Sequence, residues 1–137
     1  MRSDGLARRT CLGEIMQSNT WVQLTDSRGR DAHAVIMPYV ISTLSVLALT
    51  VFGGERLEVG AIKFAIAAWV VLGSVWTMLW FDGVIADLGA AMKDMDEEMA
   101  ASNVGKNFAK APFPFFRVFN AFVITVMIVV QLIALYS

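Results

Sequence analysis

Three long runs of apolar residues interrupt an otherwise polar chain. The first, residues 34–52, has no charged side chain, and the second, residues 61–81, has only Lys63, one turn from its start. The third, residues 119–136, contains Asn120 near its start and Gln131 near its end. A helix over the 19 residues of the first run is roughly 28 Å long, close to the ~30 Å hydrocarbon core of a bilayer. The pattern predicts three transmembrane helices.

The kind of pattern also decides the fold class. The runs are continuous rather than alternating, which excludes the strands of a membrane β-barrel, and they would leave a soluble helical core without a polar face. Hydrophobic residues make up 57% of the chain and charged residues 17%, against about 45–50% and about 25% in soluble domains. The prediction is an all-α integral membrane protein embedded in a lipid bilayer.

The connections between the runs differ in length. Residues 53–60 form a short outer loop rich in glycine, which predicts that the first two helices are an antiparallel hairpin. Residues 82–112 form a long connection with no proline before Pro112. We therefore expect the second helix to extend into the cytoplasm as an amphipathic, acidic segment that stops near Asn103 and Gly105.

The distribution of Lys and Arg predicts the orientation. Nine of the 11 Lys and Arg residues lie in residues 1–33 or between residues 82 and 117, and the other two, Arg56 and Lys63, flank the short loop. Cytoplasmic flanks carry the excess of Lys and Arg in membrane proteins. The N-terminus and the long connection are therefore expected in the cytoplasm, and the C-terminus on the opposite side.

The polar segment before the first run is not expected to be a cleaved signal, because the apolar run begins too late and is too long for a signal sequence. Met16 is an alternative start, and the residues before it are expected to be unstructured. Trp21 and Leu24 are expected along the membrane interface, followed by a polar turn at residues 25–31.

Candidate ligands for a cofactor or metal are few. His33, the only histidine, lies at the cytoplasmic mouth of the first helix. It could be an axial ligand of a haem or chlorophyll-type pigment, or a proton-relay group. The alternative is an interfacial side chain bonded to water or headgroups. The last reading is favoured. Cys11 has no partner motif, and the acidic residues 94–98 lack the glycine and glutamate positions of a calcium loop. No metal and no cofactor is predicted.

Two further groups are assigned to packing and anchoring. Small residues and amides that let helices approach or hydrogen-bond within the membrane are Ala61, Ala65, Ala68, Asn120 and Gln131. Interfacial anchors are Trp80, Phe81, Phe113, Phe116 and Arg117, within an aromatic segment that opens residues 113–137, the third transmembrane unit. Trp69 and Trp76 lie deeper, and packing against neighbours is favoured over flanking a lipid or pigment.

One stripe in the long connection is a candidate docking surface. Its members recur at spacings of three, four, three and four, which places them on one face of a continuous helix: Ile85, Leu88, Met92, Met95 and Met99. Its methionines make an adaptable apolar surface. The stripe either packs on the chain's own segment around Trp21 and Leu24 or docks a partner subunit or a second copy.

Three functions are compatible with these features. No Asp or Glu lies inside an apolar run and no catalytic motif is present, so an enzyme is not predicted. A net charge of −1 argues against nucleic-acid binding. The favoured prediction is a small membrane subunit or accessory protein that packs against other membrane-protein subunits or itself. The alternatives are a homo-oligomeric channel lined by Ser, Thr, Asn120 and Gln131, and a cofactor- or pigment-binding protein using His33.

Overall fold

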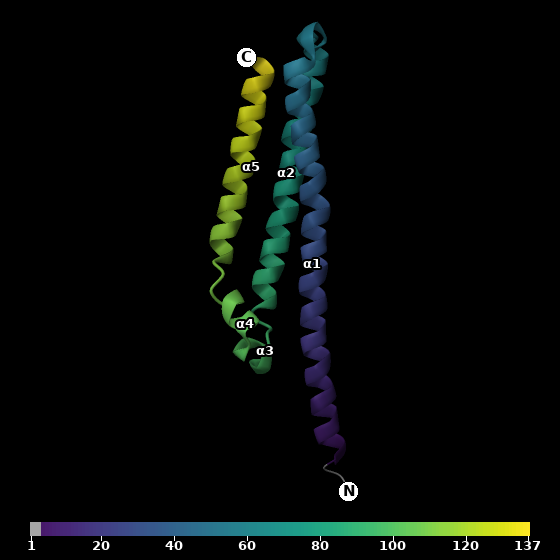
Figure 1. Cartoon of the computed structure of the whole chain (residues 1–137), viewed down its shortest axis with the longest axis vertical. Helices are drawn as coiled ribbons and strands as arrows, with labels where there is room; N and C mark the ends of the chain where they lie inside the picture. Colours follow the sequence, from purple (N-terminus) through teal and green to yellow (C-terminus); the bar gives the residue numbers. More distant parts are fainter. Residues whose placement is uncertain (1–3) are drawn as a thin grey trace.

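The computed structural model describes the backbone of residues 4–137 and the side chains of residues 20–55 and 57–137. This part of the chain is all-helical, as predicted. The elements in chain order are α1 (Asp4–Phe52), the 3-10 helix η1 (Gly54–Glu58), α2 (Gly60–Ala91), α3 (Glu97–Ala101), α4 (Asn103–Phe108) and α5 (Phe113–Tyr136). Three of them, α1, α2 and α5, are long and lie side by side (Figure 1).

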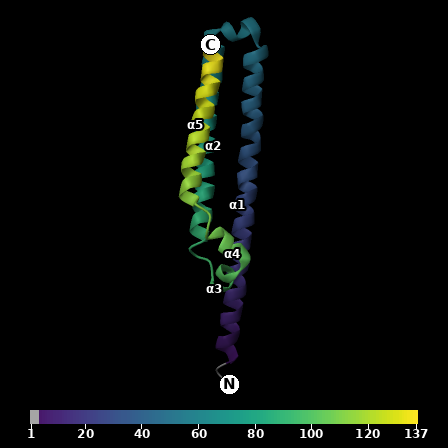
Figure 2. The same ribbon diagram turned by 60° about the vertical axis from the view of Figure 1, so that its left-hand side comes forward.

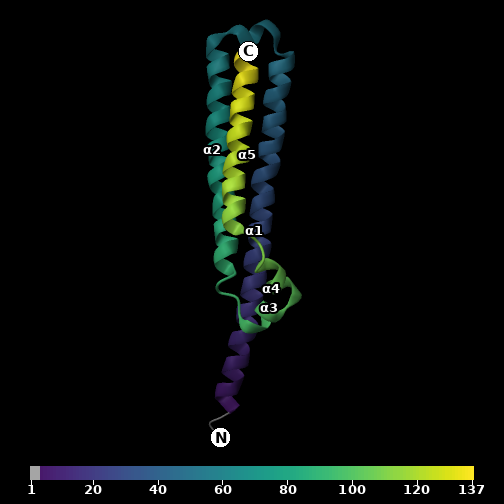
Figure 3. The same ribbon diagram turned by 90° about the vertical axis from the view of Figure 1, so that its left-hand side faces the viewer.

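Helix α2 is the central element of the bundle. It packs along both α1 and α5, whereas α1 and α5 make far fewer contacts with each other. The 3-10 helix η1 joins α1 to α2 at one end of the bundle, and α3 and α4 join α2 to α5 at the other (Figure 3). The C-terminus lies at the η1 end, and the N-terminal part of α1 extends past the α3/α4 end (Figure 2).

The long helices have the length and composition of membrane spans, as predicted. Stretches of 33, 32 and 24 residues within α1, α2 and α5 qualify, and an 18-residue window within each has a mean hydropathy of 2.1, 1.8 and 2.5, respectively. Charged side chains bound the apolar zone, with Lys63 near the η1 end and Asp82 and Arg117 near the α3/α4 end. From Lys63 to Asp82, α2 rises roughly 28 Å, which matches the ~30 Å hydrocarbon thickness.

Helix α1 runs without interruption through two segments where no helix was predicted. Residues 4–15, which precede Met16, and the predicted turn at residues 25–31 both belong to it. Across the predicted turn, Arg30 pairs with Asp26 at 2.7 Å one helical turn away, and such pairs support a helix. Pro38 lies deep inside α1 instead of in its first turns, and its missing N–H leaves the carbonyl of residue 34 without a helical donor.

Helix α2 ends at Ala91 instead of continuing to Asn103. The competing structure comes from two capping side chains: Asp96 accepts a hydrogen bond from the Met99 N–H at 2.7 Å, and Ser102 accepts one from the Gly105 N–H at 3.0 Å. Such caps start new helices. The five residues of the predicted docking stripe therefore lie on α2 (Ile85, Leu88), in the connection (Met92, Met95) and on α3 (Met99), and they do not form one stripe of a single helix.

Gly105 has a different role from the helix stop that the sequence predicted. It lies buried within α4. A Cβ atom there would overlap the Met99 carbonyl oxygen and lie 2.9 Å from the Cα of Ala100. Glycine is therefore required for the close approach of α3 and α4, and it keeps these two short helices folded against each other.

The inside of the bundle is small and partly polar. Among the side chains that the structure describes, the buried polar ones are Thr43, Ser74, Thr77 and Gln131, and the buried apolar ones are Val46, Val70, Val84, Ile85, Ala91, Ile124 and Leu135. Large apolar side chains such as Leu72 and Val51 project outward. This arrangement, polar groups inside and apolar groups outside, suits a lipid surrounding in which polar groups must find partners within the protein.

Candidate functional site

A hollow of about 280 Å³ with a partly polar lining opens between α1 and α2, in the C-terminal half of α1 and near the middle of α2, and we call it the midspan cleft. Helix α5 contributes only Gln131 to it. The lining residues are Ala34, Val35, Pro38, Tyr39, Ser42, Thr43, Val46, Trp69, Val70, Gly73, Ser74, Trp76, Thr77 and Gln131. Hydroxyl, indole and amide groups are thus gathered in one place, with no charged side chain among them.

Hydrogen bonds across the cleft hold α1 against α2. The hydroxyls of Tyr39 and Ser74 lie 3.2 Å apart, and the indole N–H of Trp69 donates to the Ser42 hydroxyl at 2.8 Å. Gln131 is 2% exposed, and its amide donates to the Met127 carbonyl of its own helix at 3.2 Å. Gln131 therefore contributes a buried amide to the lining of the cleft.

The cleft lies at the depth of the hydrocarbon core. Ser74 is 11 residues from Lys63 and eight from Asp82 along α2, or roughly 16 Å and roughly 12 Å along the helix axis. These two charged residues mark the ends of the apolar zone. The polar lining is therefore placed where the surroundings offer the fewest hydrogen-bond partners.

Two tryptophans project outward at the rim of the cleft. Trp69 and Trp76 are 62% and 66% exposed, and they do not pack between the helices of their own chain. Trp76 stacks on Trp80 with ring centroids 6.1 Å apart. The indole N–H of Trp76 has no hydrogen-bond partner in the part of the chain whose side chains are described.

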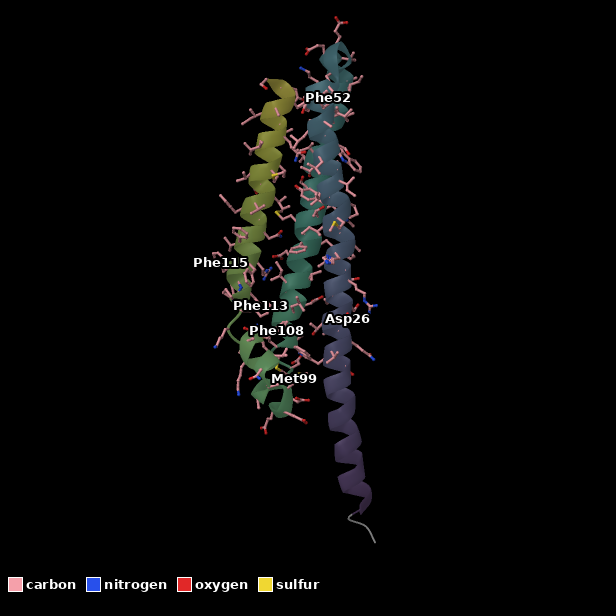
Figure 4. The ribbon with its side chains drawn as sticks, viewed as in Figure 1. Asp26, Phe52, Met99, Phe108, Phe113 and Phe115 are labelled. Carbon is pink, nitrogen blue, oxygen red and sulfur yellow. The ribbon has the colours of Figure 1, made fainter. Side chains whose placement is uncertain are left out.

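A second hollow, of about 490 Å³, lies at the α3/α4 end between α2, α4 and α5, and we call it the phenylalanine groove. Its lining is almost entirely apolar: Phe81, Ile85, Leu88, Asn107, Phe108, Ala111, Phe113, Phe116, Phe119, Asn120 and Val123. Phe108 of α4 and Phe113 of α5 meet at the junction of the two helices, with ring centroids 6.3 Å apart (Figure 4).

Trp21 fastens the α3/α4 end to α1. Its ring packs edge-on against Phe108 with centroids 5.7 Å apart, and its indole N–H donates to the Ala91 carbonyl at 3.0 Å. One side chain of α1 thus contacts both α4 and the last residue of α2. The segment around Trp21 therefore contacts the end of α2 and α4. These contacts are made with Ala91 and Phe108, which are not members of the predicted docking stripe.

Ion pairs clamp the three long helices at this same level. Arg117 of α5 holds both carboxylate oxygens of Asp82 at 2.6 and 2.7 Å. Arg28 of α1 contacts Asp87 of α2 at 2.8 Å and Asp31 of its own helix at 3.3 Å. The sequence reading missed these pairs. Their signal was available, since Asp82 and Arg117 are opposite charges that end two apolar runs at equal depth.

The predicted anchors gather at the α3/α4 end. Phe81, Phe113 and Phe116 line the phenylalanine groove, and Trp80 is 45% exposed. Arg117, expected to extend toward the interface, is ion-paired with α2.

The predicted packing residues divide into two groups. The Asn120 amide donates to the Met78 carbonyl of α2 at 3.2 Å, and Gln131 points into the midspan cleft. Ala61 and Ala65 are exposed in the single chain, and Ala68 is partly exposed. The amides therefore face protein, whereas the alanine positions lie at the surface of the bundle.

His33 is exposed on α1 in a shallow hollow whose lining, including Asp26 and Arg30, comes from α1 alone. Among the described residues there is no group of three His, Cys, Asp or Glu side chains that could hold a metal ion. The side chain of Cys11 lies outside the described residues.

No protein-family model, curated protein or solved structure matches this chain. Its class therefore rests on its own helices. Three of them are long and apolar enough to cross a membrane, which indicates a multi-pass membrane protein.

Proposed function

We propose that the protein is a small membrane-embedded subunit or accessory protein that packs against a partner helix across the midspan cleft. The observation that carries this proposal is a polar, laterally open cleft at hydrocarbon depth, lined by Tyr39, Ser42, Thr43 and Gln131. This role needs no catalytic group.

Some polar groups at the cleft lack a hydrogen-bond partner among the described residues. The Trp76 indole N–H lies at the rim of the cleft without a hydrogen-bond partner in the described part of the chain, and Pro38 cannot supply the N–H that the Ala34 carbonyl would accept in a regular helix. Lipid tails carry no donor or acceptor groups for these atoms. A helix of another membrane protein, or of a second copy, supplies such groups. Hydrogen bonds between membrane helices are each worth about 0.6–2 kcal/mol.

The rim of the cleft has the shape for helix packing. Trp69, Gly73 and Trp76 recur at spacings of four and three along α2, so they share one face. A Cβ atom on Gly73 would meet nothing within 4 Å. The space in front of Gly73 therefore admits the backbone of an approaching helix, flanked by the two indole rings.

The orientation belongs to the same proposal. The α3/α4 end and the N-terminal part of α1 face the cytoplasm, because nine of the 11 Lys and Arg residues lie there. The C-terminus faces the opposite side. A C-terminal reporter that is active only outside the cytoplasm is expected to be active, and activity of a cytoplasm-dependent reporter at the same position contradicts this orientation.

Site-specific photo-crosslinking in native membranes tests the packing role. A benzoylphenylalanine in place of Trp76 is expected to give one discrete protein adduct, whereas the same probe in place of Ile133, which is 62% exposed on α5, reacts with lipid. Adding Gly73→Leu, which fills the space before the cleft, should lower the Trp76 adduct several-fold. Equal lipid labelling at both positions, with no protein adduct, contradicts the proposal.

A permeation role is the second candidate, favoured by a second polar hollow in line with the cleft. This hollow, of about 630 Å³, lies at the η1 end and is lined by residues that include Thr50, Lys63 and Leu135. One helical turn separates Thr50 from Val46 of the cleft, and one turn separates Leu135 from Gln131. If this role holds, the Trp76 adduct has the mass of two copies of the chain, and vesicles containing the purified protein conduct water or ions.

A further inference from the structure

The phenylalanine groove has the chemistry of an acyl-chain site. Its only polar side chains are two asparagines, and the amide of Asn120 is already bonded to the Met78 carbonyl. The groove lies at the edge of the apolar zone, since its lining residues Phe81 and Phe116 directly precede the ion-paired Asp82 and Arg117. An apolar hollow at this depth is reached from the hydrocarbon side by a lipid tail and from the other side by a headgroup.

Positive charge lies next to the groove. Lys106 precedes the lining residue Asn107, and Lys110 precedes the lining residue Ala111. Both lysines are exposed, and neither forms an ion pair within the described part of the chain. The two carboxylates of α2 that adjoin groove residues, Asp82 and Asp87, are paired with Arg117 and Arg28.

Acidic and basic residues are separated between the two short helices. Helix α3 carries Glu97 and Glu98 and no lysine, whereas α4 and the turn after it carry Lys106 and Lys110 and no acid. In a continuous helix through this region, the acidic and basic side chains would have belonged to the same helix. The break at residues 92–96 instead separates the acids of α3 from the lysines of α4 and the turn after it, and each lysine adjoins a groove residue in sequence.

We propose that the phenylalanine groove binds one acyl chain of an anionic glycerophospholipid, with the lipid phosphate held by Lys106 and Lys110. The apolar lining takes the tail, and the two ammonium groups select the charged headgroup. Lys and Arg at a membrane surface attract anionic lipid by an amount that corresponds to about fivefold in affinity per residue. This site is independent of the partner proposed for the midspan cleft.

Native mass spectrometry of the purified full chain tests the site. The probes are phosphatidylglycerol and phosphatidylcholine with identical acyl chains, and the chain should bind one molecule of phosphatidylglycerol more tightly. The double variant Lys106→Gln, Lys110→Gln should lose roughly 10- to 30-fold in phosphatidylglycerol affinity while phosphatidylcholine binding is unchanged. Lys93→Gln is the matched control, because Lys93 is exposed but not adjacent to a groove residue, and it should change neither affinity.

A second pair of variants tests the tail. Ala111→Phe places a large side chain in the groove and should abolish tight binding of both lipids, whereas Ala109→Phe, at an exposed position outside the groove, should leave it intact. The proposal is overturned if the lysine variants keep the headgroup preference, if Ala111→Phe binds lipid as the wild type does, or if the groove variant instead dissociates a dimer of the chain.

Discussion

The two hollows of this molecule are opposites in chemistry and in place. The midspan cleft is polar and lies about halfway between Lys63 and Asp82, where the bilayer is hydrocarbon. The phenylalanine groove is apolar and lies at the level of the Asp82–Arg117 ion pair, where the bilayer begins to give way to water. Each hollow therefore differs from its own surroundings.

Because their chemistry differs, the two hollows are stabilised by different kinds of molecule. A polar cleft in hydrocarbon is stabilised only by groups that hydrogen-bond, which other protein helices carry and lipid tails do not. An apolar groove beside water is stabilised when an apolar group such as a lipid tail covers it and removes its surface from water. The two proposals accordingly place a protein helix at one hollow and a lipid tail in the other.

The largest expected effect is at the α3/α4 end. Gly105→Ala should destabilise the folded chain by about 1–3 kcal/mol, because the new Cβ overlaps the Met99 carbonyl and forces α3 away from α4. Faster limited proteolysis between α2 and α5 measures the effect. Gly83→Ala is the control: a Cβ there meets nothing within 4 Å, and alanine favours a helix. Equal behaviour of the two variants would show that the approach of α3 and α4 is not tight.

A smaller effect is expected where α1 holds the groove in place. Trp21→Phe keeps an aromatic ring beside Phe108 but removes the indole N–H that donates to the Ala91 carbonyl, which should cost about 1 kcal/mol. Hydrogen exchange of the α4 amides should accelerate accordingly. Trp80→Phe should leave exchange in α4 unchanged, since the Trp80 indole has no hydrogen bond within the described chain. Unchanged exchange in the Trp21 variant would contradict the proposed fastening.

The smallest effect on the single chain is expected in the cleft. Gln131→Leu should change the stability of the single chain by about 0.6 kcal/mol, because the buried Gln131 amide bonds only to its own helix at Met127. Association with the partner should weaken by about 0.6–2 kcal/mol. The control is Thr125→Val, an exposed hydroxyl that bonds to its own helix at Ala121, which should alter neither. Loss of folding in the Gln131 variant would mean that the cleft serves the chain itself.

The apolar pattern was sufficient to predict three helices, because membrane spans are specified by length and hydrophobicity alone. It was insufficient for the connections. The break after Ala91 depends on Asp96 and Ser102, which compete with the helix by capping new ones. The continuity of α1 across residues 25–31 depends on ion pairs one helical turn apart and on Arg28 reaching Asp87 of α2, contacts that no local pattern reveals.

The candidate sites were predictable to different degrees. Asn120 and Gln131 were predictable as packing residues because amides are rare in an apolar run. Asn120 bonds to α2, and Gln131 lines the cleft. The remaining lining of the cleft could not be predicted from the sequence. Tyr39, Ser42 and Ser74 are far apart along the chain and come together only when α1 packs against α2. The groove was hidden for the same reason, since Phe108 belongs to a helix that the pattern did not predict.

Depth in the bilayer is the central claim, and spin-label accessibility measures it directly. In a Cys11→Ser background, labels are introduced by Leu44→Cys and Val129→Cys, exposed positions within the apolar parts of α1 and α5, and by Val104→Cys, an exposed position on α4. In lipid vesicles, the first two labels should collide with dissolved oxygen far more than with a water-soluble nickel complex, and the α4 label should show the reverse. Equal nickel accessibility at all three positions would contradict the placement of the midspan cleft in the hydrocarbon and of the α3/α4 end at its boundary.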